Sequence, residues 1–115
     1  MLRTMCKSKI RGAIVTGAKL HYEGSIGVDR EILDAADILP WERVQVVNLN
    51  NGARLETYAI EEQAGSGVIC LKGPAARLGQ VGDEIIILSY VSVSDEEARR
   101  LKPLVVSLQA NNRVK

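Results

Sequence analysis

The sequence predicts one mainly β domain over residues 1–115, a small β-barrel with short helices. A chain of this length can build one hydrophobic core but not two. Short runs rich in β-branched residues recur along it, and turn-forming residues separate them. Because closure of a sheet removes its exposed edges, regularly spaced short strands in so small a chain favour a barrel.

Six runs are predicted strands because they are short, apolar and bounded by turn-forming residues. Asn50-Asn51-Gly52 predicts a hairpin between the second and third runs, since Asn and Gly tolerate the positive φ of a tight turn. Gln80-Val81-Gly82-Asp83 predicts the turn before the fifth run. The six runs are Gly12–Thr16, Val44–Leu49, Arg54–Ile60, Gly67–Leu71, Glu84–Val91 and Leu104–Leu108.

Three short helices are predicted from their first residues. Asp29 is a suitable N-cap for the first helix, and Pro74 suits the first turn of the second. Ser94 and Glu97 have the spacing of a capping box at the start of the third. The polar tail, residues 109–115, is expected to fray. The three predicted helices cover residues 29–36, 74–77 and 94–101.

The composition narrows the classes of partner and site. With 15 basic and 14 acidic residues and no long basic run, the chain predicts no nucleic-acid partner. Its longest apolar run, Ile85–Leu88, is too short to span a bilayer, and residues 1–7 lack the apolar centre of a secretion signal. We therefore expect a cytoplasmic protein without membrane association. Cys6, Cys70 and the only histidine, His21, predict neither a disulfide framework nor a metal site.

Gly24-Ser25 is the dipeptide on which the functional interpretation depends. Gly-Ser is common in turns, and a second copy occurs at Gly65-Ser66, so the dipeptide by itself predicts only a turn. The first copy differs in its setting, because it ends the segment His21-Tyr22-Glu23-Gly24-Ser25 just beyond a strand-like run.

Seven short segments in this order and spacing resemble one family, the bacterial pyruvoyl-dependent aspartate 1-decarboxylases. The similarity extends from residue 1 to about residue 106. It implies a double-psi β-barrel, a homotetramer, and conversion of L-aspartate to β-alanine and carbon dioxide for pantothenate biosynthesis. The segments are Arg3-Thr4-Met5, Lys9-Ile10, His21-Tyr22-Glu23-Gly24-Ser25, Asn51-Gly52-Ala53-Arg54, Thr57-Tyr58, Gly73-Pro74-Ala75-Ala76 and Asp95-Glu96-Glu97-Ala98.

The resemblance implies that the chain cuts itself between Gly24 and Ser25. The Ser25 hydroxyl would attack the Gly24 carbonyl to form an ester, and Gly24 has no side chain to obstruct that attack. Elimination and hydrolysis would leave a pyruvoyl group in place of Ser25. Residues 1–24 would then be the β chain of the mature enzyme and residues 25–115 its α chain. The pyruvoyl ketone would form a Schiff base with the substrate amine and accept the electrons of the breaking carbon–carboxylate bond.

The family's catalytic and cation positions are matched by four residues. Ser25 would become the pyruvoyl cofactor, and Tyr58 resembles the donor that protonates the substrate carbon. Lys9 and Arg54 resemble the cations that hold the substrate carboxylate. Three of these residues also have a structural interpretation. Lys9 would be a solvated lysine, and Tyr58 would pack at a barrel end. Arg54 would pack beside Tyr58 on the same face of a strand, since the two are four residues apart. The family match favours the catalytic interpretation when the residues are taken together.

Three further residues are implied to bind substrate. Thr57 resembles a residue that hydrogen-bonds near the scissile carbonyl and the substrate. The backbone N–H groups of Gly73 and Ala75 resemble further substrate contacts, as a helix start can offer an anion.

Three positions depart from the family pattern. Arg11 stands where the family usually has His and keeps a cation there. Lys72 replaces an Asn near the processing site, so a group that only donates replaces one that also accepts. Slower self-cleavage is therefore expected. Pro74 replaces an Ala and has no N–H to offer a substrate.

Two alternatives remain open at the level of sequence. The first is a related pyruvoyl enzyme for another amino acid such as glutamate, because one methylene changes binding by only about 1–3 kcal/mol. The second is an unprocessed, non-enzymatic barrel that acts as an interaction module. It predicts an intact bond between Gly24 and Ser25.

Overall fold

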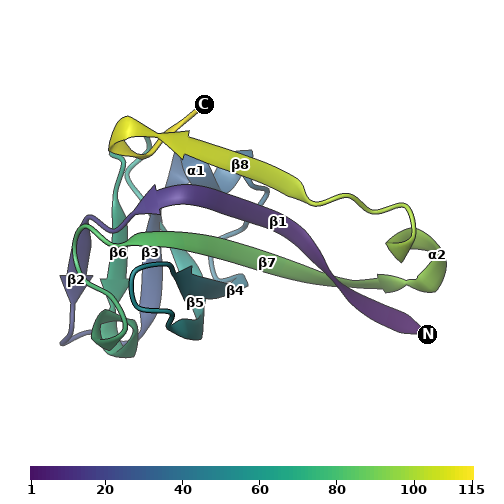
Figure 1. Cartoon of the computed structure of the whole chain (residues 1–115), viewed down its shortest axis with the longest axis horizontal. Helices are drawn as coiled ribbons and strands as arrows, with labels where there is room; N and C mark the ends of the chain where they lie inside the picture. Colours follow the sequence, from purple (N-terminus) through teal and green to yellow (C-terminus); the bar gives the residue numbers. More distant parts are fainter.

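A long antiparallel pair of strands runs the length of the molecule, and shorter strands surround one end of it (Figure 1). The computed structural model describes all of residues 1–115 as one uncleaved chain. The long pair is β1 with β7, and the chain's N-terminus and α2 lie at its far end. The strands are β1 (Leu2–Ile14), β2 (Gly17–Lys19), β3 (Ser25–Asp29), β4 (Arg43–Asn48), β5 (Arg54–Glu62), β6 (Ile69–Lys72), β7 (Glu84–Ser94), β8 (Leu104–Gln109) and β9 (Arg113–Val114). The helices are α1 (Arg30–Ala35), η1 (Gly73–Arg77), α2 (Asp95–Ala98) and η2 (Ala110–Asn112).

The strands form one sheet that curls back on itself. Its order is β2-β6-β3-β5-β4-β7-β1-β8-β9. The chain passes from β1 to β2 through only Val15 and Thr16, so one continuous segment pairs with β7 at one side and with β6 at the other. The Thr16 N–H donates to the Ile69 carbonyl at 2.8 Å within this link. The predicted mainly β class is confirmed, and this ring is consistent with a double-psi β-barrel.

The ring encloses the hydrophobic core. Nineteen buried residues form one cluster, and most of them come from strands. In β4 the buried positions alternate, as they do where one face of a strand meets the core. β3 differs, because all five of its residues are buried. It is paired with β5 on one side and β6 on the other. The strand that begins at Ser25 is therefore among the most enclosed in the protein.

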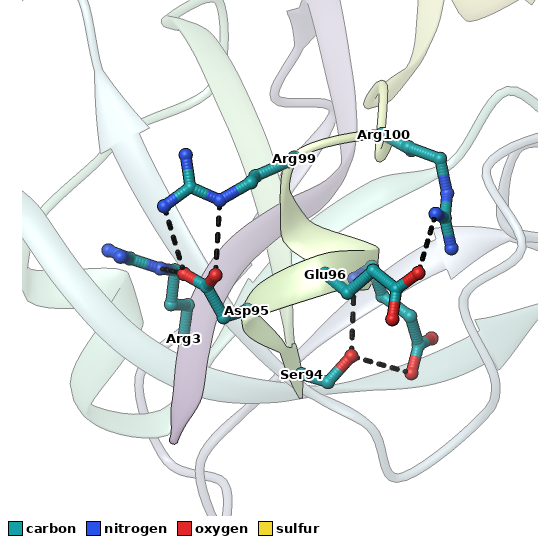
Figure 2. A network of polar contacts seen from close by, with 7 residues as sticks. Arg3, Ser94, Asp95, Glu96, Arg99 and Arg100 are labelled. Carbon is teal, nitrogen blue, oxygen red and sulfur yellow. Dashed lines mark hydrogen bonds and ion pairs between the residues drawn. The ribbon is translucent and has the colours of Figure 1, made fainter.

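The predicted N-caps at Asp29 and Ser94 are confirmed, although α2 ends at Ala98 rather than at Leu101. The turn predicted from Pro74 is a 3₁₀ helix that begins one residue earlier, at Gly73. The Asp29 carboxylate accepts from the Glu31 N–H at 2.8 Å, and the Ser94 hydroxyl accepts from the Glu97 N–H at 3.1 Å. Figure 2 shows the α2 cap together with Arg3 of β1, whose side chain donates to the Asp95 carboxylate at 2.6 Å. Hydrogen bonds from Arg99 and Arg3 lower the pKa of Asp95 below its ordinary value. These contacts tie α2 to the far end of β1.

Two predictions about the chain's ends need correction. β1 begins ten residues before the predicted start at Gly12, because Leu2–Arg11 is stabilised by pairing with β7 and β8 rather than by an apolar run. The polar tail does not fray. Its Asn112 is 3% exposed, and its side-chain amide donates to the carbonyls of Ile14 and Gly67. The short strands β2, β3 and β9 were also not predicted.

No helix of the structure is long and apolar enough to cross a membrane. No group of three His, Cys, Asp or Glu side chains is arranged to hold a metal ion.

Candidate active site

Gly24 and Ser25 lie at the junction between an exposed loop and the buried strand β3. Gly24 has a φ of +77°, which a residue with a side chain rarely adopts. Ser25 is 2% exposed, and its Oγ atom has no hydrogen-bond partner. A buried hydroxyl without a partner is costly in a folded protein and calls for an explanation. The structure thus provides an unengaged serine oxygen directly after a conformationally free glycine.

Gly73 lies directly against the loop that precedes Ser25. Its φ is +68°, and a Cβ atom at this position would lie 2.5 Å from both the Gly24 nitrogen and the Tyr22 carbonyl oxygen. Real Cβ atoms essentially never approach backbone so closely. Pro74 continues this contact, since its Cδ is 3.5 Å from where a Gly24 Cβ would be. The start of η1 therefore packs closely against the loop from Tyr22 to Gly24.

Two pockets flank the Gly24–Ser25 bond, and Tyr58 lines both of them. The first, of about 380 Å³, includes Ser25 and Tyr58 among its lining residues. The second, of about 310 Å³, includes Gly24, Thr57, Tyr58 and Ala75. Both volumes are of the size that small-molecule sites have. Tyr58 is therefore the side chain common to the spaces on either side of the bond.

The Tyr58 ring is stacked on that of Trp41. The ring centroids are 5.2 Å apart and the planes differ by 19°. Trp41 lies in the turn between α1 and β4 with a φ of 73°. This left-handed conformation costs a non-glycine residue roughly 1–2 kcal/mol. The indole also lines the pocket that contains Ser25.

Lys72 is a buried lysine on β6 and is the cross-strand partner of Ser25 on β3. Its Nζ lies 2.8 Å from Glu62 Oε2 and 4.9 Å from the centroid of the Tyr22 ring. Burial by itself lowers the pKa of the Lys72 ammonium, but the hydrogen bond and charge of Glu62 outweigh it and raise that pKa above its ordinary value. Lys72 is therefore a permanent positive charge at physiological pH.

The structure brings together most of the predicted site residues, but not all. Gly24, Ser25, Thr57, Tyr58 and Ala75 line the two pockets, and Gly73 packs against Gly24. Arg54 is exposed at the start of β5, takes part in none of the chain's ion pairs and lines neither pocket. Lys9 is on β1 between β7 and β8 and also lines neither pocket.

A larger hollow of about 550 Å³ lies elsewhere, over β4, β5 and β7. Arg43, Glu56 and Tyr90 line it, and none of the predicted site residues does. Size therefore does not identify the site here. The chemistry of Ser25 and Tyr58 does.

Sequence reasoning missed two residues of this region. Trp41 follows Pro40 in a turn, and its one available signal was that it is the only tryptophan of the chain. Glu62 carries no signal of its own, since an acidic residue near the end of a strand is ordinarily solvated. Only the pairing of β3 with both β5 and β6 places it beside Lys72.

Comparisons with known proteins agree with the resemblance read from the sequence. A protein named aspartate 1-decarboxylase from Thermoanaerobacter pseudethanolicus is 58% identical over 113 residues, which is 98% of this chain and 97% of that protein. Another of that name from Syntrophomonas wolfei is 56% identical over 115 residues, covering 100% of this chain and 98% of its own. A third, from Moorella thermoacetica, is 58% identical over 114 residues, or 99% and 89% of the two chains.

A model of the aspartate decarboxylase family matches residues 1–115, the whole chain. Identities above half over nearly the full length of several relatives point the same way. These matches show that the chain belongs to the aspartate decarboxylase family.

Proposed function

We propose that this protein decarboxylates L-aspartate at the α-carbon, giving β-alanine and carbon dioxide for pantothenate biosynthesis. Membership of the family and the names of its relatives support this substrate. The observation that carries the proposal is the buried Ser25 hydroxyl without a hydrogen-bond partner, next to a glycine and two small pockets. A turn serine would be expected at the surface, bound to water.

The residues around Ser25 suit self-cleavage to a pyruvoyl cofactor. An uncommitted hydroxyl is free to attack the Gly24 carbonyl, and the positive φ of Gly24 gives the backbone the freedom that an ester requires. A pyruvoyl group at position 25 supplies a ketone that binds the substrate amine and withdraws electrons from the breaking carbon–carboxylate bond.

Tyr58 is the proposed proton donor. It lines the pocket that contains Ser25, so a substrate held there lies beside its phenol. Thr57 and the backbone of Ala75 are proposed to bind the substrate from the adjoining pocket, and buried Gly73 is proposed to add its N–H. Pro74 has no N–H and is assigned no such role.

The cations Arg54 and Lys9 are proposed to hold the substrate carboxylate. Arg54 shares β5 with Tyr58, four residues away, so the two side chains project from the same face. Lys9 lies on β1 and, like Arg54, lines neither pocket of its own chain, so we propose that these cations meet the substrate where subunits adjoin. The proposal therefore includes a homotetramer, in which the subunits complete one another's sites. It also includes a cytoplasmic location, since both Cys6 and Cys70 are free thiols, as a reducing compartment favours.

Intact-mass measurement of the purified protein tests this proposal. We expect two fragments, residues 1–24 and residues 25–115, with the larger one carrying a carbonyl that reacts with hydroxylamine. Ser25→Ala should remain a single chain because it removes the attacking oxygen. An intact wild-type chain after prolonged incubation would support the non-enzymatic module instead. Parallel assays with aspartate and glutamate then decide the substrate, and faster turnover of glutamate would refute the aspartate assignment.

A further inference from the structure

Trp41 stands where the fold by itself favours a different residue. Its φ of 73° suits Gly or Asn better than a bulky aromatic residue, and its side chain is 74% exposed. Neither burial nor local conformation therefore accounts for an indole at this position. Trp41 is also the only tryptophan of the chain.

The turn that carries Trp41 is anchored to the strand that carries Tyr58. The Trp41 N–H donates to the Ala59 carbonyl at 2.7 Å, and the Ala59 N–H donates to the Glu42 carbonyl at 3.0 Å. These two bonds hold the turn against β5 one residue beyond Tyr58. The backbone thus sets the indole in an offset stack on the phenol ring, with centroids 5.2 Å apart and planes that differ by 19°.

The stack limits how the Tyr58 side chain can move. A tyrosine turns about two bonds, and a second ring packed parallel to its face excludes most of those rotations. Pro40 and Trp41 also form part of the wall of the pocket that contains Ser25 and Tyr58. The indole therefore touches the ring that is proposed to deliver a proton, inside the space that is proposed to hold the substrate.

We propose that Trp41 is a positioning residue for Tyr58 and one wall of the substrate pocket. Its ring keeps the phenol in the orientation in which the hydroxyl faces the substrate carbon next to position 25. This inference rests on the proposed role of Tyr58 as proton donor. It explains why a strained and exposed turn position carries the largest side chain of the molecule.

Steady-state kinetics of self-cleaved Trp41 variants test the proposal. Trp41→Asn relieves the backbone and removes the ring, so we expect an unchanged or higher melting temperature and a kcat lower by about 3- to 10-fold. Trp41→Phe keeps a ring and should recover most of that loss. Leu39→Asn is the matched control, because Leu39 is 67% exposed in the same turn and lines neither pocket. A wild-type kcat in Trp41→Asn, or equal losses in Trp41→Asn and Trp41→Phe, would overturn the proposal.

Fluorescence provides a second test that needs no activity, because all tryptophan emission comes from Trp41. Tyr58→Leu should make this emission more accessible to acrylamide quenching. Tyr90→Leu should not, since Tyr90 is hydrogen-bonded to Gln45 and lines a different hollow from Trp41. Equal quenching in the wild type and Tyr58→Leu would refute the stack. If the self-cleaved wild-type protein leaves aspartate unchanged, the proposed function fails, and the quenching comparison still decides whether Trp41 holds Tyr58.

Discussion

The Glu62 carboxylate on β5 meets the Lys72 ammonium on β6 across the intervening strand β3. Their Oε2 and Nζ atoms are 2.8 Å apart, and the Lys72 side chain is 8% exposed. The pair crosses β3 at Gly27, where a Cβ atom would lie 2.1 Å from Glu62 Oε2. The absence of a side chain at residue 27 therefore makes room for an ion pair over the strand that begins at Ser25.

We expect Lys72→Asn to destabilise the protein, because it leaves the half-buried Glu62 carboxylate without its partner. The loss should be about 1–3 kcal/mol in free energy of unfolding. Urea denaturation in a Ser25→Ala background, where no cleavage occurs, measures it. Glu62→Gln/Lys72→Asn should recover most of the loss, and equal losses in the single and double variants would contradict the interpretation. Because the pKa of Lys72 is raised above its ordinary 10.5, its contribution should be constant from neutral pH to pH 9 and decline only as the ammonium loses its proton.

Lys72→Asn should also change the rate of self-cleavage. It restores the amide that the family usually carries beside the processing site, so fragments should appear faster than in the wild type. A gel time course on freshly purified precursor measures this. An unchanged rate would show that Lys72 does not slow maturation.

Gly73→Ala should impair self-cleavage more than stability alone explains. The new Cβ would lie 2.5 Å from the Tyr22 carbonyl oxygen and the Gly24 nitrogen, so the loop from Tyr22 to Gly24 must move. A displacement of about 1 Å can slow such a reaction by about 10²-fold. Gly52→Ala is the matched control, since Gly52 has a φ of +76° but no atom within 4 Å of its Cβ position. Similar cleavage rates in the two variants would argue against close contact between η1 and the loop.

Arg54→Lys should mature normally but bind aspartate poorly. An ammonium cannot reproduce the planar two-bond contact of a guanidinium with a carboxylate, and the loss of one charged hydrogen bond raises KM by about 10-fold or more. The effect should be mainly on KM if the contact is equally strong in the ground and transition states. Arg43→Lys on the neighbouring strand serves as control. An unchanged KM in Arg54→Lys would assign the carboxylate to another cation such as Lys9 or Arg11.

Tyr58→Phe should separate maturation from turnover. The proposed self-cleavage uses the Ser25 hydroxyl and the Gly24 carbonyl, so the variant should still form both fragments. The ring and its stack on Trp41 are kept, while the proton is lost, and kcat should fall by about 10²–10⁴-fold. Measurement of β-alanine release from fully cleaved protein checks this, with Tyr90→Phe as control. Near-normal decarboxylation would eliminate Tyr58 as the proton donor.

Much of the secondary structure was determined by the sequence locally. The caps at Asp29 and Ser94, the hairpin at Asn50-Asn51-Gly52 and the five predicted strands from Val44 onward lie within three residues of their predicted places. Each depends on interactions between residues close in the chain, such as a side chain with the next turn's N–H. Family membership was equally accessible, because it rests on the order of short segments.

Tertiary structure alone decided how the site is assembled. The first ten residues of β1 and the polar tail lack local strand signals and are ordered by long-range pairing, as the buried amide of Asn112 shows. The same holds at the site, where Ser25 loses its hydrogen-bond partners only because β3 is enclosed between β5 and β6. Glu62 and Trp41 reach Lys72 and Tyr58 across gaps of 10 and 17 residues in the chain. Such contacts depend on strand order and on one turn's anchoring to β5, which no local pattern of residues encodes.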